Sequence, residues 1–143
     1  MLPRILLIIT VLGVGLGLLF GTAVTSAENT ESQDTEVRKL LLQKRDILQQ
    51  QVKHFTQAHL MGKANYGEVL DAQMEVLGVE LELAGSKADR IAVLESRVKN
   101  RQVLEVQMES QFRTGGVTQD KILTAKTEQI DAQIALLREK ARE

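Results

Sequence analysis

The chain has 143 residues, with 18 lysines and arginines against 19 aspartates and glutamates, so its formal net charge is −1. This balance gives neither a basic field for nucleic acid nor an acidic tail, and we expect no nucleic-acid partner. The sequence contains no cysteine and only 3 % aromatic residues. It therefore excludes disulfide bonds and an ordinary aromatic-rich globular core.

The first 27 residues have the pattern of a secretory signal peptide. Arg4 gives a short basic region, and residues 5–20 are apolar with interspersed glycines. Thr25 and Ala27 are the small pair of a cleavage site, and we favour cleavage after Ala27. The alternative is an uncleaved membrane anchor, because an apolar stretch over residues 5–24 is long enough to cross a bilayer. In either case the sequence predicts an exported protein.

Residues 28–35 are polar and acidic and offer nothing to bury, so we expect a flexible leader there. A first helix is predicted from about Thr35 to Met61, with Asp34 or Thr35 as its N-cap. Its composition of Leu, Gln, Glu, Lys and Arg favours helix, and Gly62 is placed to end it.

A second helix is predicted to begin at Asn65, because Glu68 three residues later completes a capping-box pattern. Its apolar residues follow the alternating four-and-three spacing of a coiled-coil seam. The seam residues are Leu70, Met74, Leu77, Leu81, Ala84, Ala88 and Ile91. We expect this seam to pack against other helices.

Gly85 leaves two interpretations open. The glycine can end the second helix, with Ser86 capping a third helix and Asp89 closing the cap. Alternatively the helix continues through Gly85 at a cost of about 1 kcal/mol. We favour a break, with the third helix running to about Phe112.

A fourth helix is predicted from Thr118, its N-cap, to near Arg142, with Asp120 in the first turn. Its apolar residues repeat the spacing of the second helix and form a second seam. The residues of this seam are Leu123, Thr127, Ile130, Ile134, Leu137 and Ala141.

An internal repeat joins these elements. The segment from Gly62 to Gln73 reappears in degraded form from Gly115 to Lys126, an offset of about 53 residues. We therefore predict an all-α fold of two tandem antiparallel helical hairpins of about 53 residues each, in a coiled-coil-like bundle. The hairpins occupy residues 36–86 and 87–143. Short connections make neighbours antiparallel, so both glycine turns should lie at one end.

Two arrangements remain open. The hairpins can form a closed up-down bundle of four helices, or an extended array of three if the helix continues through Gly85.

The turn and the helix that follows it resemble the periplasmic hairpins of TolC-family outer-membrane efflux proteins. The first copy carries the resemblance in Gly62 and in residues 68–73 and 80–84; the second does so in residues 112–118, 122–123 and 125. In that family the turns at the hairpin tips dock a periplasmic adaptor. The resemblance thus implies partner contacts at the two turns, which comprise Gly62, Lys63, Ala64, Asn65, Gly115, Gly116, Val117 and Thr118.

The same resemblance implies the periplasm or cell envelope of a Gram-negative-type bacterium as the location. The family also has β-strands that complete a membrane barrel, and this sequence predicts none. A self-sufficient export channel is therefore not expected.

No catalytic or metal-binding pattern accompanies the helices. His54 and His59 are the only histidines, and five residues apart on a helix they point in different directions. There is no nucleophile motif or phosphate loop, and we expect no cofactor, no metal and no small-molecule substrate.

We therefore predict a non-enzymatic interaction protein that contacts a protein partner, or itself, through its helices. If residues 5–24 are not cleaved, they would also attach the chain to a membrane. The alternatives are a structural envelope spacer without a dedicated partner and an enzyme or metal-carrying bundle.

Overall fold

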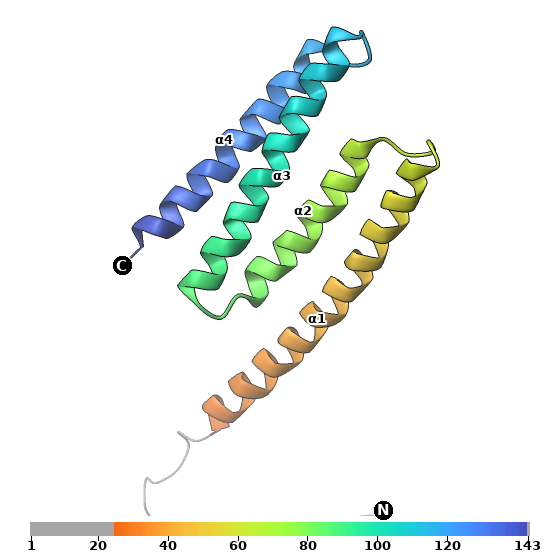
Figure 1. Ribbon diagram of the computed structural model, residues 1–143. Helices are drawn as coiled ribbons and strands as arrows, with labels where there is room; N and C mark the ends of the chain where they lie inside the picture. Colours follow the sequence, from red (N-terminus) through yellow and green to blue (C-terminus); the bar gives the residue numbers. More distant parts are fainter. Residues whose placement is uncertain (1–24, 143) are drawn as a thin grey trace, which may run out of the picture.

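The computed structural model describes residues 25–142, with side chains from residue 33 on, and in this part of the chain every regular element is a helix. The helices are α1 (Thr25–Leu60), α2 (Tyr66–Leu83), α3 (Lys87–Arg113) and α4 (Gln119–Ala141). Figure 1 shows them as two consecutive antiparallel hairpins, α1–α2 and α3–α4. The predicted all-α fold class is confirmed.

The first helix begins earlier than predicted. The structure starts α1 at Thr25, so the N-cap expected at Asp34 or Thr35 is wrong, and residues 28–35 are helical rather than a flexible leader. This segment contains neither glycine nor proline, and its acidic residues lie toward the helix N-terminus, where the helix dipole favours negative charge. The predicted signal segment and its apolar stretch lie mostly outside the described residues.

The two glycine turns have the same backbone geometry. Gly62 has φ of 69° and Gly115 has φ of 74°, in the left-handed region. The same pair of backbone hydrogen bonds closes each turn. Gly62 donates to the His59 carbonyl and Lys63 to the Ala58 carbonyl, and in the second turn Gly115 donates to Phe112 and Gly116 to Gln111. This is the Schellman arrangement, and its recurrence at the repeat offset shows that the repeat is structural as well as sequential.

The predicted helix starts are confirmed at three positions. Asn65 caps α2 with the full capping box, since its side chain accepts from the Glu68 amide while the Glu68 carboxylate accepts from the Asn65 amide. Ser86 caps α3, which confirms the break at Gly85. Thr118 occupies the N-cap position of α4, but its side chain makes no capping hydrogen bond. Its hydroxyl instead donates to the Asp120 carboxylate, which holds the pKa of Asp120 below its ordinary value.

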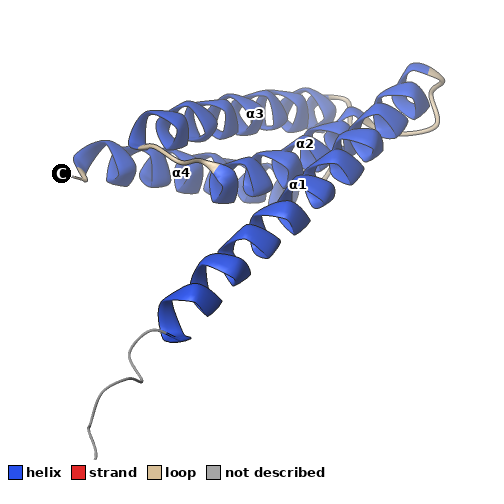
Figure 2. Cartoon of the chain, turned by 90° about the horizontal axis from the view of Figure 1, so that it is seen from below, coloured by secondary structure: helices blue, strands red, loops and turns tan. Residues whose placement is uncertain are grey.

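The four helices pack in chain order, α1 on α2, α2 on α3 and α3 on α4, and α1 does not contact α4 in the described structure. The array is open, so neither a closed four-helix bundle nor a three-helix arrangement forms. Figure 1 shows both glycine turns at one end and the α2–α3 loop at the other. In Figure 2, α1 runs away from the other three helices toward its N-terminal end.

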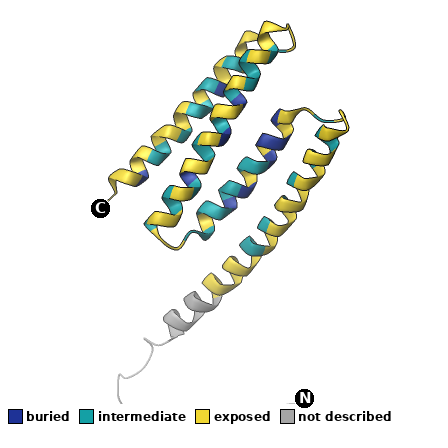
Figure 3. Cartoon of the chain, in the orientation of Figure 1, coloured by how far each residue is buried: buried dark blue, intermediate teal, exposed yellow. Residues whose placement is uncertain are grey.

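The core lies where three helices meet. Leu70 of α2, Leu104 of α3 and Ala125 of α4 form one buried cluster, with Met108 packed against it. Figure 3 shows buried residues on α2, α3 and α4, whereas the described part of α1 is exposed or only half-buried. Because each outer helix has a single neighbour, an open array leaves much of α1 and α4 facing solvent.

The turn glycines give a prediction with an internal control. Alanine at Gly62 or Gly115 should cost about 1–2 kcal/mol each, because an L-residue in the left-handed region meets its own backbone. Gly78 lies inside α2, and a Cβ built on it meets nothing within 4 Å. Gly78→Ala should therefore stabilise the protein by about 0.5–1 kcal/mol. Thermal unfolding of the three variants measures this, and equal effects at Gly62 and Gly78 would contradict it.

Candidate interaction surfaces

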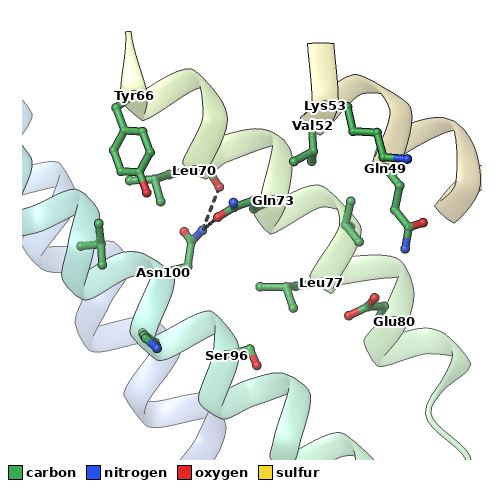
Figure 4. A pocket seen from close by; sticks show the side chains of 13 residues that line it. Gln49, Val52, Lys53, Tyr66, Leu70, Gln73, Leu77, Glu80, Ser96 and Asn100 are labelled. Carbon is green, nitrogen blue, oxygen red and sulfur yellow. Dashed lines mark hydrogen bonds between the residues drawn. The ribbon is translucent and has the colours of Figure 1, made fainter. Parts of the chain in front are cut away.

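The interface between the hairpins is organised by a buried asparagine. Asn100 of α3 is 7 % exposed, and its side-chain amide donates to the Leu70 carbonyl and to Gln73 Oε1 of α2, both at 3.1 Å. Figure 4 shows this side chain reaching across from α3 to α2. Two bonds donated by one side chain fix the register of the hairpins, because the N–H groups of a buried amide are costly to leave unpaired. Asn100 Oδ1 is buried without a hydrogen-bond partner in the described structure.

Arg101 of α3 links the interface between the hairpins to α4. Arg101 Nη1 lies 2.9 Å from Asp71 Oδ1 of α2 and 3.4 Å from Glu128 Oε2 of α4. Arg101 thus bridges two carboxylates on the neighbouring helices α2 and α4.

A groove of about 590 Å³ runs over α1, α2 and α3 beside Asn100. Figure 4 shows Leu70, Leu77 and Val52 among the side chains that line it, with Gln49 and Lys53 on the α1 side. The lining has no cluster of acids, histidines or other groups that would support catalysis. Across the described residues, no group of three or more His, Asp or Glu side chains is placed to hold a metal ion.

The predicted seam of α2 forms one of its two packed sides. Leu70 is buried, and Met74, Leu77 and Leu81 are half-buried. This is the side that contacts α3, through Leu70 and its neighbours. A second stripe of α2, displaced by one residue, is buried more completely and was not predicted. Because α1 is the other helix that packs on α2, this stripe faces α1. Its residues are Val69, Ala72, Val76 and Val79.

The predicted seam of α4 is not buried within the chain, and this expectation is corrected. Leu123, Ile130, Ile134 and Leu137 are exposed, Leu123 by 57 % and Ile130 by 52 %. The residues of α4 that pack on α3 are displaced from this stripe, with Ala125 and Glu139 buried. The physical reason is that α4 is the last helix of the array. We call the exposed stripe the α4 outer face.

The first helix has a matching exposed side. Leu40 and Ile47 are 54 % and 65 % exposed, and Val37 lies beside them along the helix. We call Leu40 and Ile47 the α1 outer face. Ile91, which ended the predicted seam of the first repeat, is half-buried on α3.

The two turns with predicted partner contacts lie at the same end of the array. Their residues are exposed except for Ala64 and Val117, which are half-buried. Inside the first turn, the His59 ring lies 3.1 Å from the Ala64 carbonyl through Nδ1 and 5.3 Å from the Tyr66 ring. His59 thus has a structural role in shaping this turn.

A buried ion pair that the sequence did not predict joins α3 to α4 at the other end. Glu139 is 6 % exposed, and its Oε1 accepts from Arg90 Nε at 2.7 Å, while Oε2 lies 3.1 Å from Arg142. The hydrogen bond from Arg90 holds the pKa of Glu139 below its ordinary value of 4.5, against the opposing effect of burial. The start of α3 lies beside the end of α4 because the two helices are antiparallel. The predicted hairpin could therefore have suggested that Arg90 and Glu139 pair.

This pair predicts a dependence on pH. Because the folded pKa of Glu139 is depressed, its contribution to stability is present above pH 4.5 and is lost as the pH falls through the folded pKa. Wild type should therefore have a higher melting temperature than Glu139→Gln near neutral pH, and this gap in melting temperature should close on acidification. Arg90→Gln should give the same closing gap. A gap independent of pH would contradict the assignment.

None of the helices in the described part of the chain is long and apolar enough to cross a membrane. Comparisons with protein-family models, curated proteins and solved structures find no match to this chain. The likeness to TolC-family hairpins therefore remains a prediction from the sequence.

Proposed function

We propose that this chain is an exported, non-enzymatic interaction protein that works through helix–helix contacts in the cell envelope. The observation that carries the proposal is the pair of apolar outer faces on α1 and α4. Large apolar side chains that gather along one side of a helix, rather than scattering singly, are typical of surfaces that bind a partner.

The shape of the array supports this function. On α4 four apolar residues recur at helical spacing, and on α1 Leu40 and Ile47 lie two turns apart on one side, the form in which one helix binds another. The glycine turns give a second surface at one end of the array, corresponding to the hairpin tips of the TolC-like pattern. A link to efflux or secretion follows from that resemblance and belongs to the proposal.

Site-specific photo-crosslinking of the full chain in cells tests this function. A photoreactive residue at Ile130 on the α4 outer face or at Ile47 on the α1 outer face should give covalent protein adducts. The same group at Glu82, which is exposed on α2 and lies on neither face, should give few adducts. If the adduct yields at Ile130 and Ile47 do not exceed that at Glu82, the outer faces bind no protein and the proposal is wrong.

A further inference from the structure

The repeat relates the outer faces to an interface that already exists inside the chain. At the repeat offset, Leu70 corresponds to Leu123 and Leu77 corresponds to Ile130. On α2 this side meets α3, where Leu70 accepts from Asn100 and packs against Leu104. On α4 the same side meets no helix of the described chain. The α4 outer face is thus the inter-hairpin face of α2 without its partner.

The opposite side of that interface also has an unpaired equivalent. Asn100, which α3 directs at α2, corresponds to Ile47 of α1, and Val93, seven residues earlier on the same side of α3, corresponds to Leu40. Both residues of the α1 outer face are more than half exposed. The two outer sides of the described array therefore carry equivalents of residues from the two halves of the inter-hairpin interface, although Leu104 itself corresponds to Gln51.

We propose that the partner of the α4 outer face is the α1 outer face of a second copy of this chain, packed as α3 packs on α2. This deepens the proposed function and depends on it. The interface is heterologous, because different surfaces of the two copies meet. Each added copy leaves one free α1 and one free α4, so copies add until a ring closes or an open array grows.

Two polar contacts of the inter-hairpin interface change character at the inter-copy contact. The contact between Asn100 and Gln73 becomes a contact between Ile47 of one copy and Lys126 of the next, and the Lys126 ammonium is already held by Glu109 at 3.0 Å. Its methylene stem is therefore free to cover Ile47. The Arg101–Asp71 ion pair becomes Leu48 beside Thr124, so this ion pair has no counterpart between the copies.

The packing also sets the polarity of the assembly. Since α1 and α4 would lie antiparallel, as α3 and α2 do, all glycine turns gather at one end. The N-terminal ends of all α1 helices lie at the other end, where α1 projects beyond the α2–α3 loop (Figure 1). A continuous surface of turns at one end of the assembly is a consequence of this register and not a separate assumption.

Two single substitutions test the heterologous interface by mixing. In the full chain, Ile130→Asp disables the α4 outer face and Ile47→Asp disables the α1 outer face. Because both residues are exposed, the substitutions should leave the fold intact, and circular dichroism measures the helix content. Light scattering should show wild type growing with concentration and each variant monomeric. Mixed in equal amounts, the variants should form a dimer and nothing larger, since one intact α4 face meets one intact α1 face.

Several outcomes would overturn the inference. A wild-type chain that is monomeric at every concentration, a variant that dimerises alone, or association that persists in the double variant would each do so. If the chain is monomeric while photo-crosslinks at Ile130 and Ile47 lead only to other proteins, the inference fails and the proposed function stands.

Crosslinking fixes the register in the same system. The chain has no cysteine, so a single engineered thiol is unique. Ile47→Cys and Lys126→Cys chains, mixed and treated with a short bismaleimide, should give a covalent dimer that neither forms alone to the same yield. Ser110→Cys, exposed on α3 away from both faces, is the matched control with Ile47→Cys. Equal crosslinking to Ser110→Cys and Lys126→Cys would contradict the register.

Discussion

Leu70→Ala is expected to destabilise the protein by about 2–5 kcal/mol, the range for a buried leucine whose removal leaves a cavity. Leu70 is 2 % exposed and belongs to the buried cluster shared by α2, α3 and α4. Its loss removes packing from both hairpins at once, so unfolding should remain a single transition at a lower denaturant midpoint. Urea titration followed by circular dichroism measures the change.

Leu123→Ala is the matched control for this prediction. Leu123 has the same residue type and the same position in the repeat, but it is 57 % exposed on the α4 outer face. At protein concentrations low enough to keep the chain monomeric, its replacement should cost about 0.5 kcal/mol or less. Similar losses at Leu70 and Leu123 would mean that α4 is covered within the monomer, and the open array would be wrong.

Asn100→Asp is the second large effect. The side-chain amide of Asn100 donates two hydrogen bonds to oxygen acceptors, Leu70 O and Gln73 Oε1. A carboxylate at this buried position has no proton to donate and places a negative charge against both oxygens. The expected loss is about 3–5 kcal/mol, as for a buried charge without a partner.

Acidification should restore part of that loss. Burial would raise the pKa of the introduced carboxyl, so the variant should be least stable above the folded pKa and regain stability as the pH falls below it. Ile47→Asp, at the equivalent repeat position but 65 % exposed, should change stability little at any pH. An Asn100→Asp chain as stable as wild type near neutral pH would show that Asn100 does not fix the register.

Local signals in the sequence were enough to predict the helices and most of their ends. Gly62 and Gly115 sit where only a residue tolerant of positive φ fits, and Asn65 and Ser86 offer side-chain acceptors to the first amides of α2 and α3. These effects act within a few residues, so the sequence carries them directly. The early start of α1 was missed because a polar, acidic segment gives no apolar periodicity.

The arrangement of the helices could not be predicted in the same way. Periodicity shows which residues share a side of a helix, but not whether another helix covers that side. Leu70 and Leu123 have the same pattern and opposite burial for this reason. Asn100 and Glu139 were missed because polar residues are usually exposed, and only the partners across the array show that these two are buried.

The distance between the two outer helices tests the open array most directly. Spin labels at Ile47→Cys on α1 and Ile130→Cys on α4, in one chain diluted with unlabelled protein, report the distance within a monomer by pulsed electron resonance. Two helices lie between α1 and α4 in the order of packing, and each step spans about 8–10 Å, so the open array predicts a distance above about 20 Å. A main distance of about 10 Å, one helix spacing, would mean that α1 packs on α4 in a closed bundle and would contradict it.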